Sequence, residues 1–264
     1  MNRGEAGKIP FSVAIITRNE EARLADCLES VSFAEDLVVV DSDSTDRTVE
    51  IAKSYGARVF IEPWQGFSYQ KQYAVNQCKH DWVLILDADE RIPQESVTQI
   101  AQVLKDSSLK VCGFSFRRRN FFHGRWIKHC GWWPNQVLRL VDKRKGVFDG
   151  RAVHEGWIAQ GPITALDTEI VHLSYRSYSE LIDKMDRYSS IGAEDLYQKN
   201  KQTGALKPIS RGIWMFCKTY FLQKGFLDGF DGLVISLMNA AGSFFKYAKH
   251  RELTKYGRDK LHQP

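Results

Sequence analysis

Acidic side chains follow a strongly apolar segment in the first half of the chain. Residues 82–90 read WVLILDADE, so the apolar run of residues 83–86 leads directly into Asp87, Asp89 and Glu90. A short continuous apolar run is typical of a parallel strand that is buried on both faces. Ligands of open α/β sheets bind beyond the carboxyl ends of such strands. Two carboxylates at positions i and i+2 there can share a hard cation with phosphate oxygens.

A second acidic group follows another apolar run. Residues 37–46 read LVVVDSDSTD, which places Asp41 at the end of a second expected strand. Acidic residues also favour loops and the starts of helices. Loop formation alone would account for Asp43, Asp46 and Glu90, whereas Asp41 and Asp87 stand where a ligand would bind.

Spacing excludes three other kinds of ligand site. A calcium loop counted from Asp87 would need glycine at its sixth position and glutamate at its twelfth, where the chain has Ile92 and Thr98. The count from Asp41 fails in the same way. No glycine-rich turn follows the apolar run that ends at Thr17, and no GxxxxGK[ST] motif is present, which excludes a dinucleotide fold and a P-loop. The pattern that remains is a nucleotide site whose phosphates are held by a metal.

Strands alternate with helical patterns through residue 105, which predicts right-handed βαβ units and a mostly parallel sheet. Strands are expected at 11–17, 37–40, 58–61 and 82–86. For the intervening helices, we expect Asn19 to cap the first, Ser44 or Thr45 to cap the second, and Pro93 to occupy position N1 of the fourth. The third helix is expected within 66–79.

The pattern changes after residue 111, where an antiparallel or mixed extension of the sheet is expected. Its strands are predicted at 111–118, 136–141, 151–157 and 163–173. Helices are then predicted at 178–197, 209–223 and 230–249.

Composition places the chain among globular proteins. Its 264 residues are enough for one large core, or for one domain with an appendage. The first ten residues are polar, so a secretory signal is not expected. The five cysteines are scattered without CxxC spacing, which favours reduced thiols in the cytoplasm. The net charge of +5 permits an anionic partner without requiring one.

The order of these motifs resembles the inverting glycosyltransferases of family 2. The motifs are TRNEE (17–21), VVVDSDSTDRT (38–48), a helix bearing Lys71, LILDADE (84–90) and VHE (153–155). Within the family, the chain is most similar to bacterial enzymes of the lipopolysaccharide-core glucosyltransferase type.

The resemblance covers about residues 10–175 and implies a GT-A fold, an α/β fold with a mostly parallel central sheet flanked by helices. It implies a catalytic domain at 10–175, with a nucleotide-sugar-binding half at 10–105 and an acceptor-side half at 111–175. A helical region with amphipathic helices would follow at 176–264.

The resemblance also implies roles for individual residues toward the donor. Thr17 and Asp41 would contact the base and ribose of a nucleotide, and Lys71 would act on the base or diphosphate side. Asp87 matches the first carboxylate of the family's DxD motif, which is directed at the ribose. Asp89 matches the second, which binds Mg²⁺ or Mn²⁺ bridging the diphosphate.

Three further residues are implied on the acceptor and metal side. Glu155 is the candidate base that takes the proton from the acceptor hydroxyl, with a surface glutamate as the alternative. His154 would orient Glu155 or contact phosphate. His172 would complete the metal or diphosphate site, and the alternative is a core histidine.

Residues 117–134 are rich in aromatic and basic side chains. Trp126, Trp132 and Trp133 would stack on a sugar while the basic residues pair with acceptor phosphates, or the stretch packs as a partly buried loop over the sheet. No nucleic-acid-binding motif accompanies it, so a nucleic-acid partner is not expected.

The carboxy-terminal helices are apolar but too short to span a bilayer. The longest charge-free run there, 232–245, has 14 residues, whereas a spanning helix needs about 20. Their many aromatic and basic residues suit a helix at the surface of an anionic membrane. They suit equally a helix pair packed on the catalytic domain or on a second subunit.

The resemblance therefore implies a metal-dependent inverting transferase. It would move a hexose, with glucose expected, from a UDP-sugar to a lipid-linked or lipopolysaccharide-core saccharide. It would be cytoplasmic and peripheral on the inner face of the bacterial cell membrane. The alternatives are a nucleotidyltransferase acting on sugar phosphates and a non-catalytic relative that binds glycan or membrane. The sequence leaves the donor sugar, the acceptor, the metal and the oligomeric state open.

Overall fold

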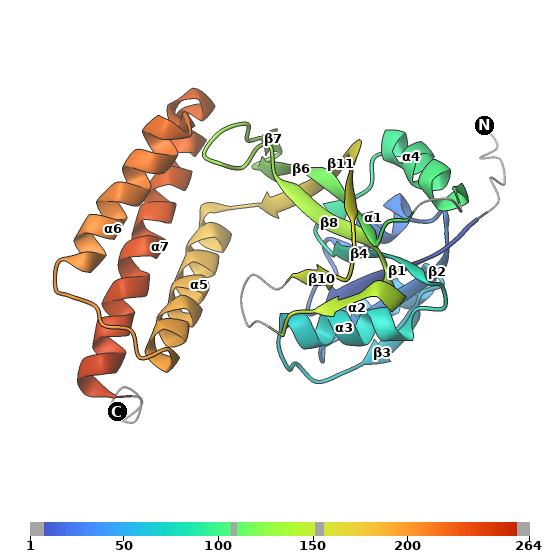
Figure 1. Cartoon of the computed structure of the whole chain (residues 1–264), viewed down its shortest axis with the longest axis horizontal. Coiled ribbons are helices and arrows are strands. Elements are labelled where there is room, and N and C mark those ends of the chain that lie inside the picture. Colours follow the sequence, from blue (N-terminus) through green and yellow to red (C-terminus); the bar gives the residue numbers. More distant parts are fainter. Residues whose placement is uncertain (1–7, 107–109, 151–155, 258–264) are drawn as a thin grey trace. The chain divides into compact units, whose positions relative to one another are not determined.

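The computed structural model describes residues 8–106, 110–150 and 156–257, within two compact units (Figure 1). The first unit comprises residues 1–119 and 135–172, and the second comprises 120–134 and 173–264. The segment 120–134 therefore groups with the carboxy-terminal helices, although it is separated from them in sequence.

The first unit is built on a sheet whose first half is parallel. Its strands are β3 (Arg58–Ile61), β2 (Ala34–Asp41), β1 (Ile9–Thr17) and β4 (Trp82–Asp87), in that spatial order. All three pairings among them are parallel, as the alternation of strands and helices predicts. Strand β1 lies between β2 and β4, so the carboxyl ends of these three strands share one edge.

The second half of the sheet is the predicted mixed extension. It continues through β8 (Gln136–Asp142), β6 (Gly113–Phe122), β11 (Ile163–Tyr175) and β5 (Glu90–Arg91). Strand β8 pairs antiparallel with both β4 and β6, and β5 pairs antiparallel with β11. A separate hairpin joins β9 (Gly146–Phe148) to β10 (Trp157–Ala159). Residues 151–155, part of an expected strand, lie outside the described residues.

Both faces of the parallel strands are covered, which explains why they read as continuous apolar runs. The flanking helices are α1 (Leu24–Ser30), α2 (Thr48–Ser54), α3 (Phe67–Gln77) and α4 (Gln94–Lys105). Val13 and Leu84 face a core shared with α1, α2 and α4. Ala14 and Val83, their neighbours in sequence, face a second core shared with α3. The α/β class predicted from the sequence is confirmed.

Three of the predicted helix starts are wrong. Asn19 does not cap α1, which begins at Leu24; Asn19 has a left-handed φ of 54° and its side chain accepts the N–H of Thr45. Helix α2 is preceded by Arg47 rather than by Ser44 or Thr45, because those residues bond to the preceding loop instead. Pro93 is the N-cap of α4 and not its first helical residue.

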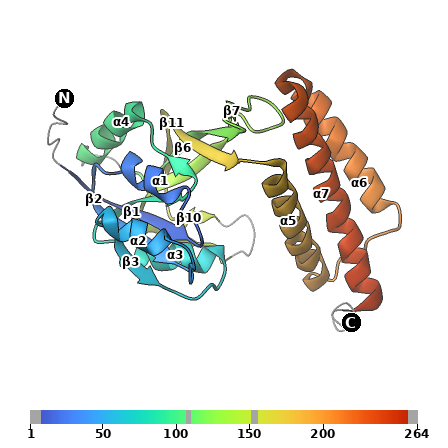
Figure 2. The ribbon, with the colours of Figure 1, turned by 180° about the vertical axis from the view of Figure 1, so that it is seen from behind.

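The second unit is mainly helical. It contains α5 (Tyr178–Gln198), α6 (Lys207–Phe216), a π-helical turn η2 (Cys217–Leu222), a 3₁₀ turn η3 (Gly225–Asp228) and α7 (Gly229–Tyr256), with the short strand β7 (Arg125–Trp126). Helices α5 and α6 both pack along α7, as Figures 1 and 2 show from opposite sides. The last helix is longer than predicted. No helix in the described ranges has both the length and the apolar character that crossing a membrane requires.

Candidate functional site

The pairing of strands β2, β1 and β4 brings the predicted nucleotide residues to one edge of the sheet. Thr17 lies opposite Asp41 in the β1–β2 pair, and Ile16 lies opposite Asp87 in the β1–β4 pair. The carboxylates at the last residues of β2 and β4 therefore flank the end of β1. This is the edge at which α/β sheets bind ligands.

Asp41 is buried and held in one orientation. The hydroxyl of Thr17 donates to its Oδ2 at 2.9 Å, and the backbone N–H of Ser44 donates to its Oδ1 at 2.8 Å. The hydroxyl of Ser44 also donates to Oδ2. A carboxylate with this many donors is fixed in position and can present its remaining lone pairs to a ligand.

The loops after β1 and β2 form one structure. The N–H of Asn19 donates to Ser44 Oγ at 2.8 Å, and the N–H of Glu21 donates to Asp46 at 3.1 Å. Desolvation acts to raise the pKa of Asp46, but the hydroxyl and N–H of Thr48 donate to it and hold its pKa below the usual value. Thus hydrogen bonds join the two sequence motifs TRNEE and DSDSTDRT, which are separate in the chain, into one loop structure.

Asp87 lies between two cations. Lys71 Nζ, from the buried face of α3, is 2.9 Å from Asp87 Oδ1, and an Arg139 guanidinium nitrogen is 2.7 Å from Oδ2. Burial acts to raise the pKa of Asp87, but Lys71 and Arg139 hold it well below its usual range. Asp87 is therefore an anion at neutral pH. Lys71 and Asp87, which were each expected to contact the nucleotide, also contact each other.

Glu90 is fully buried in β5, so the interpretation that it serves only a loop is wrong. Its Oε1 is 2.6 Å from Arg139 and 3.2 Å from Arg118, and its Oε2 accepts the backbone N–H of Asp87. Burial acts to lower the pKa of Arg139, but Glu90 and Asp87 raise it well above its usual value. Glu90 thus fixes both the backbone at Asp87 and the arginine that contacts it.

This ion cluster brings three basic side chains to the two carboxylates. Lys71, Arg118 and Arg139 surround the two carboxylates of Asp87 and Glu90. These three side chains are charge-assisted hydrogen-bond donors beside the strand edge, and a phosphate oxygen is an acceptor that suits them. Sequence reasoning missed Arg139, and it expected Arg118 to pair with acceptor phosphates, whereas Arg118 contacts Glu90. A single arginine within the apolar strand 136–142 is a usable signal, because a buried arginine needs an acidic partner.

Asp89 and His172 are also adjacent. Asp89 Oδ2 is 3.2 Å from His172 Nε2, and both side chains are largely buried. The β5–β11 pairing, which places Glu90 opposite His172, creates this proximity. Neighbouring ligands of an octahedral cation with bonds of about 2.1 Å lie about 3 Å apart, so the pair fits two positions on one ion.

Additional oxygens would have to complete such an ion's coordination. No group of three or more His, Cys, Asp or Glu residues in the described part of the chain is arranged to hold a metal. Water and the oxygens of a bound phosphate are the usual additional ligands of Mg²⁺ and Mn²⁺. The residues present therefore fit a metal that binds together with a phosphate-bearing ligand.

The basic part of the segment 117–134 pairs with acids of the sheet. Arg117 lies 2.6 Å from Asp167, and Arg119 lies 2.6 Å from Glu169. In the second unit, Trp126 and Trp133 contact each other edge to face with centroids 5.1 Å apart, while Trp132 packs on a core cluster. These contacts agree with a packed segment, and stacking on a sugar stays a prediction.

Two of the predicted acceptor-side residues cannot be placed. His154 and Glu155 lie outside the described residues. The base that would act on the acceptor therefore stays a prediction from the sequence motif.

The chain is similar in sequence to known glycosyltransferases. Residues 12–154 match the profile of glycosyl transferase family 2. An uncharacterized glycosyltransferase of Rickettsia typhi is 33% identical over 94% of this chain and 89% of its own length. The lipopolysaccharide core biosynthesis glycosyltransferase LpsC of Rhizobium meliloti is 31% identical over 91% of this chain and 94% of its own length. A crystal structure of S. aureus TarS with UDP aligns at 15% identity and a TM-score of 0.46, over 95% of this chain and 92% of that one.

Proposed function

Because this chain belongs to glycosyl transferase family 2, it is a glycosyltransferase with the family's GT-A fold, and we propose that it transfers a hexose from a UDP-sugar to a lipid-linked or lipopolysaccharide-core saccharide. Glucose is the expected sugar. The observation that carries the proposal is the cationic cluster around Asp87, beside the adjacent pair Asp89 and His172. The name of the Rhizobium meliloti relative supports the acceptor class.

The nucleotide half of the donor binds at the shared edge of β1, β2 and β4. Thr17 and Asp41 contact the base and ribose, and Asp87 contacts the ribose. Lys71 and Arg139 serve a double purpose, because they keep Asp87 ionised and offer positive charge to the diphosphate. A nucleoside diphosphate is a suitable ligand because it supplies both a ribose diol for carboxylates and phosphates for cations.

Asp89 and His172 would hold a divalent metal, Mg²⁺ or Mn²⁺, together with the diphosphate. Their separation of 3.2 Å supports this assignment. When bound, such a cation would stabilise the negative charge that develops on the leaving nucleoside diphosphate. The chain's contribution is to fix the carboxylate and the imidazole, which β5 and β11 present side by side.

Transfer proceeds with inversion at the anomeric carbon. The acceptor hydroxyl oxygen attacks that carbon from the face opposite the diphosphate, the bond to the diphosphate breaks, and Glu155 accepts the hydroxyl proton. His154 orients Glu155. These two roles rest on the VHE motif alone.

A lipid-linked acceptor places the reaction at a membrane surface. We therefore propose that the protein is cytoplasmic and peripheral on the inner face of the bacterial cell membrane. The basic and aromatic residues of the helical unit support contact with anionic lipid.

A donor screen with Mn²⁺ or Mg²⁺, measuring nucleoside diphosphate release, tests the proposal. Release of UDP that requires the metal and an acceptor is expected. Asp89→Asn should lose this activity, while Asp183→Asn, which changes an exposed aspartate of α5, should keep it. Pyrophosphate as product would favour a nucleotidyltransferase. Binding of UDP-sugars without transfer to any acceptor would favour a non-catalytic relative.

A further inference from the structure

The segment that joins η2 to α7 exposes an unusual number of large apolar side chains. Five of its ten residues are apolar and about half exposed or more, namely Phe221 (56%), Leu222 (67%), Phe226 (48%), Leu227 (55%) and Phe230 (69%). Single exposed apolar residues are ordinary, whereas a contiguous group of them marks an interaction surface. We call this group the apolar tip.

The apolar tip stands on a firmly held turn. The carboxylate of Asp228, which is buried, accepts the backbone N–H of His129 at 2.8 Å and contacts His129 Nδ1 at 3.1 Å. The N–H of Cys130 donates to the carbonyl of Gln223 at 3.0 Å. A Cβ on Gly225 would lie 2.8 Å from both the sulfur of Cys130 and a backbone oxygen, so the turn packs too tightly for a side chain there. The exposed side chains are therefore presented by a fixed scaffold.

The outer face of α6 extends the apolar surface. Leu206, Ile209, Ile213 and Trp214 are each more than half exposed. The first three recur at i, i+3 and i+7, which is one face of a helix. The opposite face packs on α7, because a Cβ on Gly212 would lie 3.3 Å from the Cβ of Phe244. Helix α6 thus has one face committed to its own unit and one apolar face without a partner in the described chain.

The segment that carries most of this surface is basic, and Asp228, which follows it, is buried against His129. Residues 199–227 contain six lysines and arginines and no aspartate or glutamate. The cationic groups of Lys207 and Arg211 lie over the ring of Tyr247, 5.2 and 5.9 Å from its centroid. Apolar side chains bordered by cations are the pattern of a surface that lies in the headgroup region of an anionic bilayer.

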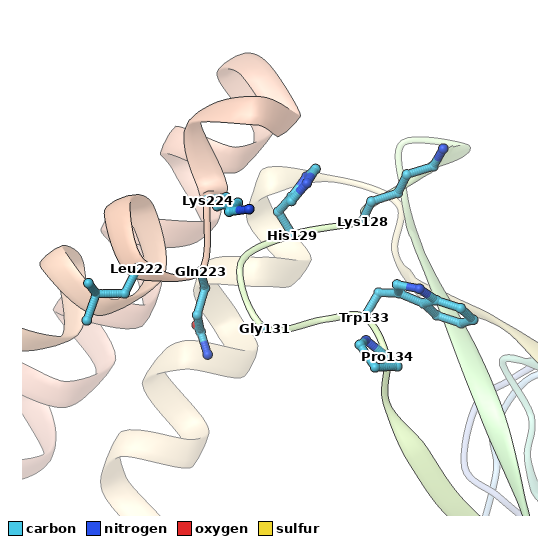
Figure 3. A pocket seen from close by; sticks show the side chains of 8 residues that line it. All are labelled: Lys128, His129, Gly131, Trp133, Pro134, Leu222, Gln223 and Lys224. Atoms are coloured by element: carbon cyan, nitrogen blue, oxygen red, sulfur yellow. The ribbon is translucent and has the colours of Figure 1, made fainter.

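A basic pocket opens beside the apolar tip. It has a volume of about 420 Å³ and is lined by Lys128, His129, Trp133, Leu222 and Lys224, among others (Figure 3). One wall comes from the 128–134 segment and the other from the turn after η2. Leu222 belongs both to the pocket and to the apolar tip. A phospholipid, whose phosphate is next to its acyl chains, suits a basic pocket that lies next to an apolar surface.

We propose that the helical unit docks on an anionic phospholipid bilayer, with the apolar tip and the outer face of α6 among the acyl chains and a lipid phosphate in the pocket of Lys128, His129 and Lys224. This inference rests on the peripheral membrane contact proposed above and deepens it, because it names the side chains that make the contact, and these lie outside the residues that hold the donor. It also supplies a physical reason for the enzyme to reach a lipid-linked acceptor.

The charge of the surface favours a bilayer over a second copy of the chain. In a two-fold dimer the same patch meets itself. The cations of residues 199–227 would then face each other without any acidic residue of that segment between them. Like charges across an interface cost several kcal/mol and suppress association, whereas an anionic headgroup layer compensates them.

Sedimentation with vesicles tests the proposal without any sugar donor, so its outcome is independent of the transferase reaction. The full chain is mixed with vesicles of phosphatidylcholine alone or with added phosphatidylglycerol. Each basic residue near an anionic surface contributes about fivefold to binding. The double variant Lys128→Gln with Lys224→Asn should therefore bind the anionic vesicles about 25-fold more weakly. Asparagine suits position 224 because Lys224 has a left-handed φ of 55°.

Two further sets of variants are tested in the same vesicle assay. The first measures how much the apolar side chains contribute to binding, and the second controls for the effect of substitution itself. Leu222→Ser with Phe226→Ser should weaken binding to both kinds of vesicle. Lys53→Gln and Ile158→Ser, which change exposed residues of the first unit, should leave binding unchanged. Circular dichroism confirms that each variant is folded.

Three results would overturn the proposal. The first is equal binding of anionic vesicles by the chain and by the double lysine variant. The second is loss of vesicle binding when glycerol phosphate is added at the same concentration as the lipid headgroups. That result would identify the pocket as a site for a soluble phosphate compound. The third is a stable dimer in light scattering that Leu222→Ser with Phe226→Ser dissociates, which would make the surface a subunit interface.

Discussion

Arg139→Met should destabilise the first unit more than the loss of any surface ion pair. The substitution leaves Glu90 fully buried with Arg118, 3.2 Å away, as its remaining cationic contact, and it removes one of the two cations on Asp87. Removing one partner of a buried ion pair costs about 3–5 kcal/mol, and Arg118 should keep the loss near about 3 kcal/mol. For a chain of this size each kcal/mol lowers the Tm by about 2–4 °C, so a decrease of about 6–12 °C is expected.

Differential scanning calorimetry at neutral pH measures this effect. The control is Arg47→Met, which removes an ion pair with Glu50 whose side chains are 71% and 68% exposed. That variant should show no measurable change in Tm, because solvent screens exposed pairs. If Arg139→Met lowered the Tm no more than Arg47→Met, the account of a buried ion cluster would be refuted.

The same cluster predicts a pH dependence with a defined sign. The folded-state pKa of Asp87 lies well below its unfolded value, because Lys71 and Arg139 favour the ionised form. Its contribution to stability is therefore complete above the unfolded pKa of about 4 and is lost as the pH falls toward the folded pKa. Arg139→Met removes one of the two cations that lower the pKa of Asp87. The difference in Tm between the variant and the unsubstituted protein should therefore become smaller below about pH 4. A difference in Tm that stays the same at all pH values would contradict this prediction.

Three further predictions concern single groups. Asp89→Asn should lower the rate of metal-stimulated transfer by at least about 100-fold, because a metal at the diphosphate stabilises the transition state by several kcal/mol. Binding of UDP without metal, measured by calorimetry, should persist. Thr17→Val removes the donor that orients buried Asp41, so it should cost about 1 kcal/mol in urea unfolding and weaken UDP binding. Burial raises the pKa of the Cys78 thiol to about 12, so in the folded protein iodoacetamide at pH 8 should modify the half-buried Cys217 before Cys78. Mass spectrometry measures the labelling, and equal labelling of Cys78 and Cys217 would contradict this prediction.

The sequence by itself determined the parallel half of the sheet and the edge where its ligand binds. A continuous apolar run must be covered on both faces, so it becomes an interior strand, and such a run can be recognised from neighbouring residues alone. The carboxylates of Asp41 and Asp87 follow such runs, so their position at one edge could be predicted. The suggestion that His172 accompanies Asp89 came from the family resemblance, and the structure places the two side chains in contact.

Only the tertiary structure decided which cations surround those carboxylates. Arg139 is 49 residues from Glu90 and Arg118 is 28 residues from it, and the antiparallel pairings of β8 with β4 and β6 bring them together. Hydrophobic periodicity assigns a strand to its face of the sheet, but it carries no information about which distant strand pairs with it. For the same reason the grouping of 120–134 with the carboxy-terminal helices, and the basic pocket that it forms beside Lys224, emerged only from the fold.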